Sequence, residues 1–248
     1  MTERLYSVQL YTLRDGITTD LPGTLERVAA MGFENVELWR FEQYRDEYRR
    51  ALSETRLRPL SAHADLVDGG GDASAVVRAA AELGIGTLIE PRIGAERWTT
   101  RGDIEAAAAR LNAVARRARD EGVTIGYHNH DHEVRHDFDG RTGLEVFAEA
   151  LDDDVVLELD TFWAEVGGAS AVELISRLGA RVKFLHVKDG PYTTTLSEQQ
   201  PVGQGAMPVT DILKAAPEAV RIVELDDYAG DMFDAVRQSL RYLMEVDR

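Results

Sequence analysis

The sequence contains no cysteine, only three lysines among its 248 residues, and no long apolar run. The lack of cysteine excludes disulfides, thiolate nucleophiles, zinc ribbons and iron–sulfur clusters. No apolar segment approaches the ~18–20 residues that a membrane-spanning helix needs. The first residues also lack a basic stretch followed by an apolar one, so we predict no secretory signal and a cytoplasmic protein.

Positive charge is scarce as well. The chain carries 28 Lys+Arg against 44 Asp+Glu, which gives a formal net charge of −16. Binding to nucleic acid requires cations that replace phosphate counterions, and an anionic membrane attracts basic segments, so this charge argues against both partners. We expect a small-molecule substrate, and the sequence leaves open whether the chain forms a homo-oligomer.

Short β-rich runs alternate with longer helical patterns from end to end. The predicted strands cover residues 5–11, 34–39, 57–63, 86–92, 123–130, 154–160, 182–188 and 220–226. The predicted helices lie near 20–32, 43–55, 72–84, 101–121, 142–151, 169–179, 209–215 and 229–246. Strict alternation of eight strands with eight helices predicts a (β/α)₈ TIM barrel, with residues 1–248 as a single domain. The alternative, a doubly wound open sheet, lacks its glycine-rich phosphate-binding turn after the first strand.

Histidines and charged residues gather at the carboxyl ends of the predicted strands, where TIM barrels build their active sites. They are His63, His128, His130, Glu158, Asp160, His186, Lys188, Glu224 and Asp226. Side chains alternate along a strand, so Glu158 and Asp160 share one face, and His186 and Lys188 share another. A strand-end aspartate such as Asp160 can equally cap the next helix.

Four neighbouring strand ends that each supply an imidazole or a carboxylate would crowd unpaired charge into one cavity, and a cation would relieve this cost. We therefore predict one divalent metal ion at the barrel mouth. Mixed imidazole and carboxylate ligands suit several metals, of which we place Mn²⁺ first, with Mg²⁺, Co²⁺, Zn²⁺ and Fe²⁺ as alternatives. His132 and His136 lie in the polar loop 131–140, and we predict that they are solvated or lie at the substrate rim.

In these motifs the sequence resembles the xylose isomerase-like TIM barrels of the sugar phosphate isomerase/epimerase superfamily. The resemblance covers nearly the whole chain and rests on the order and spacing of several short motifs. They are Val8-Gln9-Leu10-Tyr11-Thr12-Leu13-Arg14, Gly32-Phe33-Glu34-Asn35-Val36-Glu37-Leu38, Ser61-Ala62-His63, Tyr127-His128-Asn129-His130, Leu159-Asp160-Thr161-Phe162-Trp163, His186-Val187-Lys188-Asp189 and Val223-Glu224. By motif, the nearest functional relatives are ketohexose 3-epimerases and inosose dehydratases.

The resemblance to the epimerases implies a metal site made of His128, Asp160, His186 and Glu224. The chain departs from the epimerase pattern at two positions. His128 stands where an epimerase has a glutamate that moves protons, and Trp163 stands where an epimerase has a substrate-binding histidine. A strand-five histidine is closer to the inosose dehydratase pattern.

The resemblance implies a sugar isomerase or epimerase that removes the α-proton of a keto sugar or related polyol and stabilises an enediolate with its metal ion. The candidate catalytic residues are Glu224, Lys188 and His130, and the pKa of Lys188 and of His130 could be lowered beside a cation. The candidate substrate-binding residues are Gln9, Glu37, Trp39, His63, His130, Trp163 and Lys188.

Three other functions are weighed. A metal-dependent lyase or dehydratase acting on a keto-cyclitol or 3-keto-glycoside is the main alternative, and His128 and Lys188 favour it. A metal-dependent nuclease would need further strand-end histidines and less negative charge. A non-catalytic sugar-binding barrel would bind its ligand without exchanging an α-proton.

Overall fold

The computed structural model describes residues 4–68 and 72–247. The ends of the predicted domain, residues 1–3 and 248, lie outside the described residues. The strands are β1 Tyr6–Gln9, β2 Asn35–Leu38, β3 Arg58–His63, β4 Thr87–Glu90, β5 Thr124–His128, β6 Val156–Asp160, β7 Val182–Val187 and β8 Val220–Val223. They pair in parallel in chain order, and β1 also pairs with β8, which closes the barrel. The predicted TIM barrel is confirmed.

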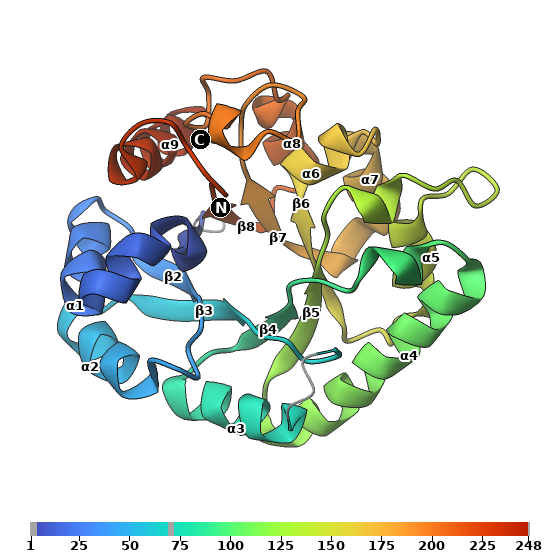
Figure 1. Cartoon of the computed structure of the whole chain (residues 1–248), viewed down its shortest axis with the longest axis horizontal. Helices are drawn as coiled ribbons and strands as arrows, with labels where there is room; N and C mark the ends of the chain where they lie inside the picture. The colour runs from blue at the N-terminus through green and yellow to red at the C-terminus, as the bar shows by residue number, and fades with distance from the viewer. Residues whose placement is uncertain (1–3, 69–71, 248) are drawn as a thin grey trace.

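Helices surround the barrel as an outer ring, as Figure 1 shows. They are α1 Arg14–Ala30, α2 Arg45–Thr55, α3 Ala73–Leu83, α4 Arg101–Ala118, α5 Gly143–Ala150, α6 Thr161–Val166, α7 Ala171–Leu178, α8 Val209–Ala215 and α9 Met232–Val246. Within residues 4–68 and 72–247, we find no helix whose length and apolar content would let it cross a lipid bilayer.

Local sequence explains where most of these helices begin and end. The Thr142 side chain accepts a hydrogen bond from the Glu145 backbone N–H, and the Glu145 side chain accepts one from the Thr142 N–H, which is the capping box that starts α5. Gly84 ends α3 with a φ of +75°, a left-handed conformation that glycine adopts at little cost.

The structure differs from the sequence-based expectations at two helices. α1 begins at Arg14 rather than near residue 20, and Asp20 interrupts it with φ −155° and ψ 83°. The Asp20 side chain accepts a hydrogen bond from the Gly23 N–H, so the predicted start corresponds to the second half of α1. α6 is an additional helix of six residues, too short to show a helical period in the sequence.

Apolar side chains fill the barrel below the mouth. Ile89, Phe184 and Ile222 form a buried cluster from β4, β7 and β8. A Cβ atom on Gly126 would lie 2.5 Å from Ile89 Cδ1, so the glycine of β5 makes room for this layer. Polar side chains must therefore collect above it, at the carboxyl ends of the strands.

Candidate metal centre and active site

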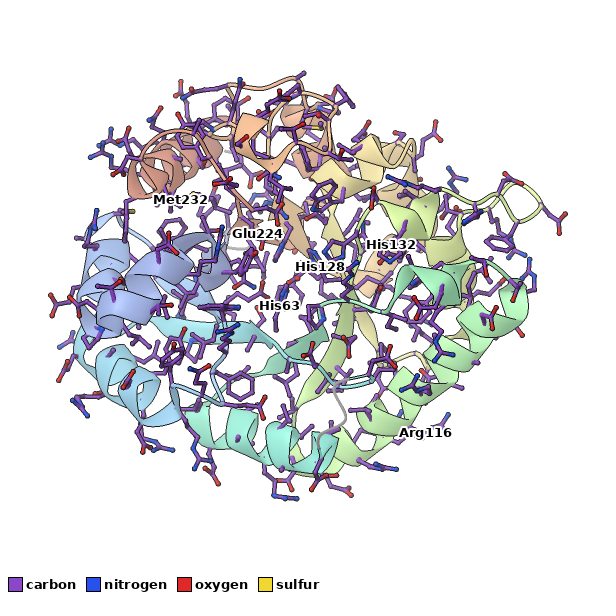
Figure 2. All side chains as sticks on the ribbon, in the orientation of Figure 1. His63, Arg116, His128, His132, Glu224 and Met232 are labelled. Carbon is purple, nitrogen blue, oxygen red and sulfur yellow. The ribbon has the colours of Figure 1, made fainter. Side chains whose placement is uncertain are left out.

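A cavity of about 370 Å³ opens at the carboxyl ends of the strands, where the sequence predicted the site. This volume lies at the small end of the ~300–1,000 Å³ range of small-molecule pockets. Its walls include five of the predicted site residues, Trp39, His63, His128, His130 and Glu224. Figure 2 shows His63, His128 and Glu224 directed to the middle of the ring.

Two buried imidazoles face each other beside this cavity. The ring centroids of His128 on β5 and His186 on β7 lie 4.6 Å apart. His186 Nδ1 lies 2.5 Å from Glu224 Oε2, and His128 Nε2 lies 3.7 Å from Asp160 Oδ2. One ligand atom from each of these four residues lies within 4.8 Å of all the others. The structure thus brings together the four residues of the expected metal site, which we call the upper group.

Asp160 serves two structural functions. Its Oδ1 accepts a hydrogen bond of 2.8 Å from the Trp163 N–H and so caps the N-terminus of α6. Its Oδ2 makes no hydrogen bond among the described residues and lies 2.9 Å from Lys188 Nζ. The helix cap and the metal-ligand geometry that the sequence suggested as alternatives therefore coexist in one carboxylate.

A second carboxylate of β6, Glu158, lies deeper in the barrel. Its Oε1 lies 2.7 Å from His63 Nε2, 3.1 Å from His128 Nδ1 and 3.0 Å from His186 Nε2. These four residues form another group of ligand-type atoms within 4.8 Å of one another, which we call the deep group. Glu158 was not among the predicted site residues, although the face that it shares with Asp160 was a signal for it.

Gln9 and Glu37 lie below the cavity rather than in its wall, and both are fully buried. Gln9 Nε2 donates a hydrogen bond of 2.7 Å to Glu37 Oε1, and Ser61 Oγ donates one of 2.5 Å to Glu37 Oε2. Glu37 Oε1 also lies 2.7 Å from His186 Nε2. In this position both side chains support His186 from below.

Lys188 contacts three carboxylates at once. Its Nζ lies 2.9 Å from Asp160 Oδ2, 2.7 Å from Glu224 Oε2 and 2.9 Å from Asp226 Oδ2. Burial disfavours the ammonium form, but the three carboxylates outweigh it and hold the pKa of Lys188 well above its usual range. This direction holds for the protein without a cation, and the lowered pKa expected for Lys188 beside a bound cation stays a prediction.

The surroundings of His130 shift its pKa in the direction opposite to that of Lys188. Burial, together with the nearby His128 and Lys188, lowers the pKa of His130 well below its usual value. Its Nδ1 has no hydrogen-bond partner among the described residues, and neither does Nε1 of Trp163, whose ring centroid lies 6.4 Å away. His130 is a neutral imidazole at the cavity with free hydrogen-bonding capacity.

Aromatic and charged side chains form the rim. The rings of Tyr11 and Trp39 meet edge to face at 5.9 Å, and the Arg40 guanidinium lies 4.5 Å from the Trp39 ring centroid. His132 Nε2 lies 3.1 Å from the Ile93 carbonyl oxygen, outside both the upper and the deep group. The exposed His136 also lies outside both groups.

The chemistry of this cluster fits a divalent cation. Burial opposes the imidazolium form of His186, yet the carboxylates of Glu158, Glu224 and Glu37 hold its pKa well above the usual value. The site therefore strongly favours positive charge, and a divalent ion satisfies that preference by replacing protons on its ligands. Buried imidazole and carboxylate ligands of this kind suit Mn²⁺, Zn²⁺ and related ions.

Comparison with known proteins places these features in a family. The family model described as "Xylose isomerase-like TIM barrel" matches residues 25–246. A search of curated protein sequences finds no match to the chain.

Several solved structures have the same fold. A sugar phosphate isomerase/epimerase from Parabacteroides distasonis is 25% identical, with a TM-score of 0.79 over 98% of this chain and 94% of its own. The IolI protein, solved with a bound zinc atom, is 18% identical, with a TM-score of 0.76 over 98% of each chain. A D-psicose 3-epimerase from Clostridium cellulolyticum, solved with D-tagatose, is 15% identical, with a TM-score of 0.71 over 98% of this chain and 99% of its own.

Proposed function

Since this chain belongs to the xylose isomerase-like TIM barrel family, we propose that it is a divalent-metal-dependent isomerase or epimerase of a keto sugar or a related polyol. The observation that carries this proposal is the upper group. It presents two imidazoles and two carboxylates within 4.8 Å of one another, beside a cavity of about 370 Å³. A neutral imidazole, His130, lines the same cavity.

His128, Asp160, His186 and Glu224 would hold the cation. When bound, it would supply the Lewis acidity that polarises a substrate carbonyl and stabilises the charge that develops on its oxygen. We place Mn²⁺ first and keep Zn²⁺, Co²⁺, Fe²⁺ and Mg²⁺ as alternatives. The zinc reported in the IolI structure supports a divalent ion in this fold.

His130 is the better base of the two candidates next to the cavity. A ring nitrogen of His130 takes the proton from the carbon beside the carbonyl, and the C–H electron pair becomes the carbon–carbon double bond of the enediolate. Glu224 is a poor base because Lys188 and His186 both contact its Oε2. Return of the proton to the former carbonyl carbon, with transfer of a hydroxyl proton between the two oxygens, gives the isomer. Delivery of a proton to the opposite face of the first carbon by a second acid, for which Lys188 is the candidate, gives the epimer.

The other side chains around the cavity orient the substrate. Lys188 holds an ammonium beside the reacting oxygens and stabilises negative charge on them. Trp39 presents an aromatic surface to the apolar face of a sugar ring, while His63 and the Trp163 indole N–H offer hydrogen bonds to hydroxyls. Gln9 and Glu37 act from below by holding His186.

A lyase or dehydratase acting on a keto-cyclitol or 3-keto-glycoside is the second candidate, and Lys188 favours it. Its ammonium can donate a proton to a leaving oxygen after the same α-proton has been removed. The loss of water or of an alcohol then replaces proton return as the final step.

The proposal is tested by α-proton exchange. The enzyme is incubated in D₂O with Mn²⁺ and, in parallel, a keto sugar, a 3-keto-glucoside and an inosose, and proton NMR is recorded after the metal is removed by chelation. We expect deuterium to be incorporated beside the carbonyl of at least one compound. This exchange should be lost in Asp160→Ala and His186→Ala. A wild type that binds these compounds without exchange, or exchanges fully when metal-free, contradicts the proposal.

A further inference from the structure

We propose that Glu158 selects which nitrogen of each histidine binds the cation, and that these atoms are Nε2 of His128 and Nδ1 of His186. Glu158 is then a positioning residue that acts through both imidazoles. The inference rests on the metal site of the proposed function, and the experiments below separate the failure of one from the failure of the other.

The two nitrogens of His128 face different carboxylates. Nδ1 lies 3.1 Å from Glu158 Oε1, which is a hydrogen-bond distance. Nε2 lies 3.7 Å from Asp160 Oδ2, which is too far for a direct hydrogen bond, and Asp160 Oδ2 makes no hydrogen bond in the described part of the chain. His128 Nε2 and Asp160 Oδ2 thus face each other without a direct hydrogen bond, and a cation between them would share Asp160 Oδ2 with Lys188 Nζ, which lies 2.9 Å from it.

His186 is held in the same manner on β7, which is separated from β5 by β6. Its Nε2 lies 3.0 Å from Glu158 Oε1 and 2.7 Å from Glu37 Oε1. Its Nδ1 is the nitrogen on the side of Glu224, which lies at the cavity. One carboxylate oxygen of Glu158 therefore contacts the deep nitrogen of both histidines.

A neutral imidazole has one N–H and one lone pair, on different nitrogens. When the N–H donates to a carboxylate, the lone pair of the other nitrogen is left for a metal ion, and the hydrogen bond also makes that nitrogen a stronger ligand. An N–H on Nδ1 of His128 donates to Glu158, and an N–H on Nε2 of His186 lies within reach of both Glu37 and Glu158. The lone pairs are then on Nε2 of His128 and Nδ1 of His186, which face Asp160 and Glu224 of the upper group.

The deep group is the competing position, because His63, His128, Glu158 and His186 also lie within 4.8 Å of one another. The two groups share both imidazoles, and one neutral imidazole cannot give a lone pair to each. In the deep group Glu158 Oε1 is already contacted by His63 Nε2 at 2.7 Å, and the buried Glu158 Oε2 has no hydrogen-bond partner among the described residues. We therefore expect one cation per chain, in the upper group.

Nitrogen-15 NMR of the histidine rings tests the assignment directly in protein loaded with Zn²⁺, which is diamagnetic. We expect that Nδ1 of His128 carries a proton and its Nε2 binds the metal. In His186 we expect the reverse, with the proton on Nε2 and the metal on Nδ1. The reverse pattern, or two zinc ions per chain, overturns the inference but leaves a metal site in place. A wild type that binds no Zn²⁺ or Mn²⁺ contradicts the proposed function instead.

Two substitutions of Glu158 add a measurement of affinity by titration calorimetry. Glu158→Gln keeps an acceptor oxygen without its charge, and Glu158→Met removes the acceptor. We expect a loss of ~10–100-fold in metal affinity for Glu158→Met, with mixed ring tautomers, and a smaller loss for Glu158→Gln.

Glu90→Gln is the matched control, because Glu90 is a buried strand-end carboxylate whose hydrogen bonds within the described residues come from backbone N–H groups, including those of Leu66 and Val67. It should bind metal as the wild type does. Glu158 variants that retain wild-type affinity and tautomers would show that the residue has no positioning function.

Discussion

The ammonium of Lys188 lies 2.7 Å from Glu224 Oε2, the same oxygen that lies 2.5 Å from His186 Nδ1. Burial disfavours the carboxylate form of Glu224, but Lys188 and His186 outweigh it and hold its pKa well below the usual range. Glu224 is thus an anion throughout the working pH range. This is suited to a metal ligand and unsuited to a base that must accept a proton.

Lys188→Met should destabilise the metal-free protein, because it leaves two buried carboxylates, Asp160 and Glu224, and the partly exposed Asp226 without their ammonium. Removal of one partner from a buried ion pair costs ~3–5 kcal/mol of unfolding free energy, and added Mn²⁺ should restore part of it. Denaturant unfolding with and without metal measures both effects. Lys183→Met is the control, since Lys183 is exposed on the same strand. Equal stability of the two variants would show that Lys188 is not a structural counter-charge.

His130→Gln should lower kcat by ~100-fold or more and change KM little, because the variant loses the base and keeps the metal ligands. Since the pKa of His130 lies well below the ordinary ~6.5 of histidine, its neutral form predominates above that pH. The activity of the wild type should therefore rise with pH only on an acid limb below ~6.5. Steady-state rates from pH 4 to 9 check this, and an unchanged acid limb in His130→Gln would assign the base elsewhere.

His128→Glu distinguishes between the two reaction classes. The new carboxylate would join Glu158 and Asp160 without a counter-charge and would weaken the Lewis acidity of a bound cation, so we expect activity to fall at least ~10-fold. His128→Gln is the neutral control. Product analysis of both variants on one accepted keto sugar is the measurement. Retained activity with an inverted product would indicate a two-carboxylate epimerase, and release of water or alcohol by the wild type would indicate a lyase.

Glu133 should make stability depend on pH. Burial raises its pKa to about 8, although the Tyr127 hydroxyl and the His130 N–H donate hydrogen bonds to it. Because the pKa of Glu133 is higher in the folded protein, its protonated carboxyl contributes full stability below pH ~4.3, which is the pKa in the unfolded chain. This contribution is lost as the pH rises through about 8. In between, the slope is up to ~1.4 kcal/mol per pH unit. Urea unfolding at pH 5, 7 and 9 should show this slope in the wild type but not in Glu133→Gln, and parallel curves would contradict it.

Periodicity and spacing were sufficient for the barrel and for the residues at its mouth. Strand alternation predicts that His186 and Lys188 share a face, and the closed barrel brings both next to Asp160. This succeeds because chain order and strand order are the same in a TIM barrel, so consecutive strand ends are spatial neighbours.

The sequence could not predict how deep in the barrel each residue lies, or whether its pKa is raised or lowered. Glu37 and Glu158 lie below the cavity because of the barrel stagger, which depends on the register between strands. The ammonium of Lys188 is stabilised by Asp226, a residue in the segment after β8 that only the three-dimensional arrangement identifies as its neighbour. Long-range contacts of this kind leave no local pattern.

The carboxylate of Asp160 connects two parts of the molecule, the start of α6 and the metal position. Because Oδ1 caps α6 and Oδ2 faces the metal position, any force that moves this side chain acts on both. Coupling between sites is reciprocal in free energy, so an ion that fixes Asp160 also steadies the start of α6, and a substitution that loosens α6 weakens ion binding. Trp163 belongs to that helix. A substitution that moves Trp163 is therefore expected to change the affinity of the proposed site for metal as well.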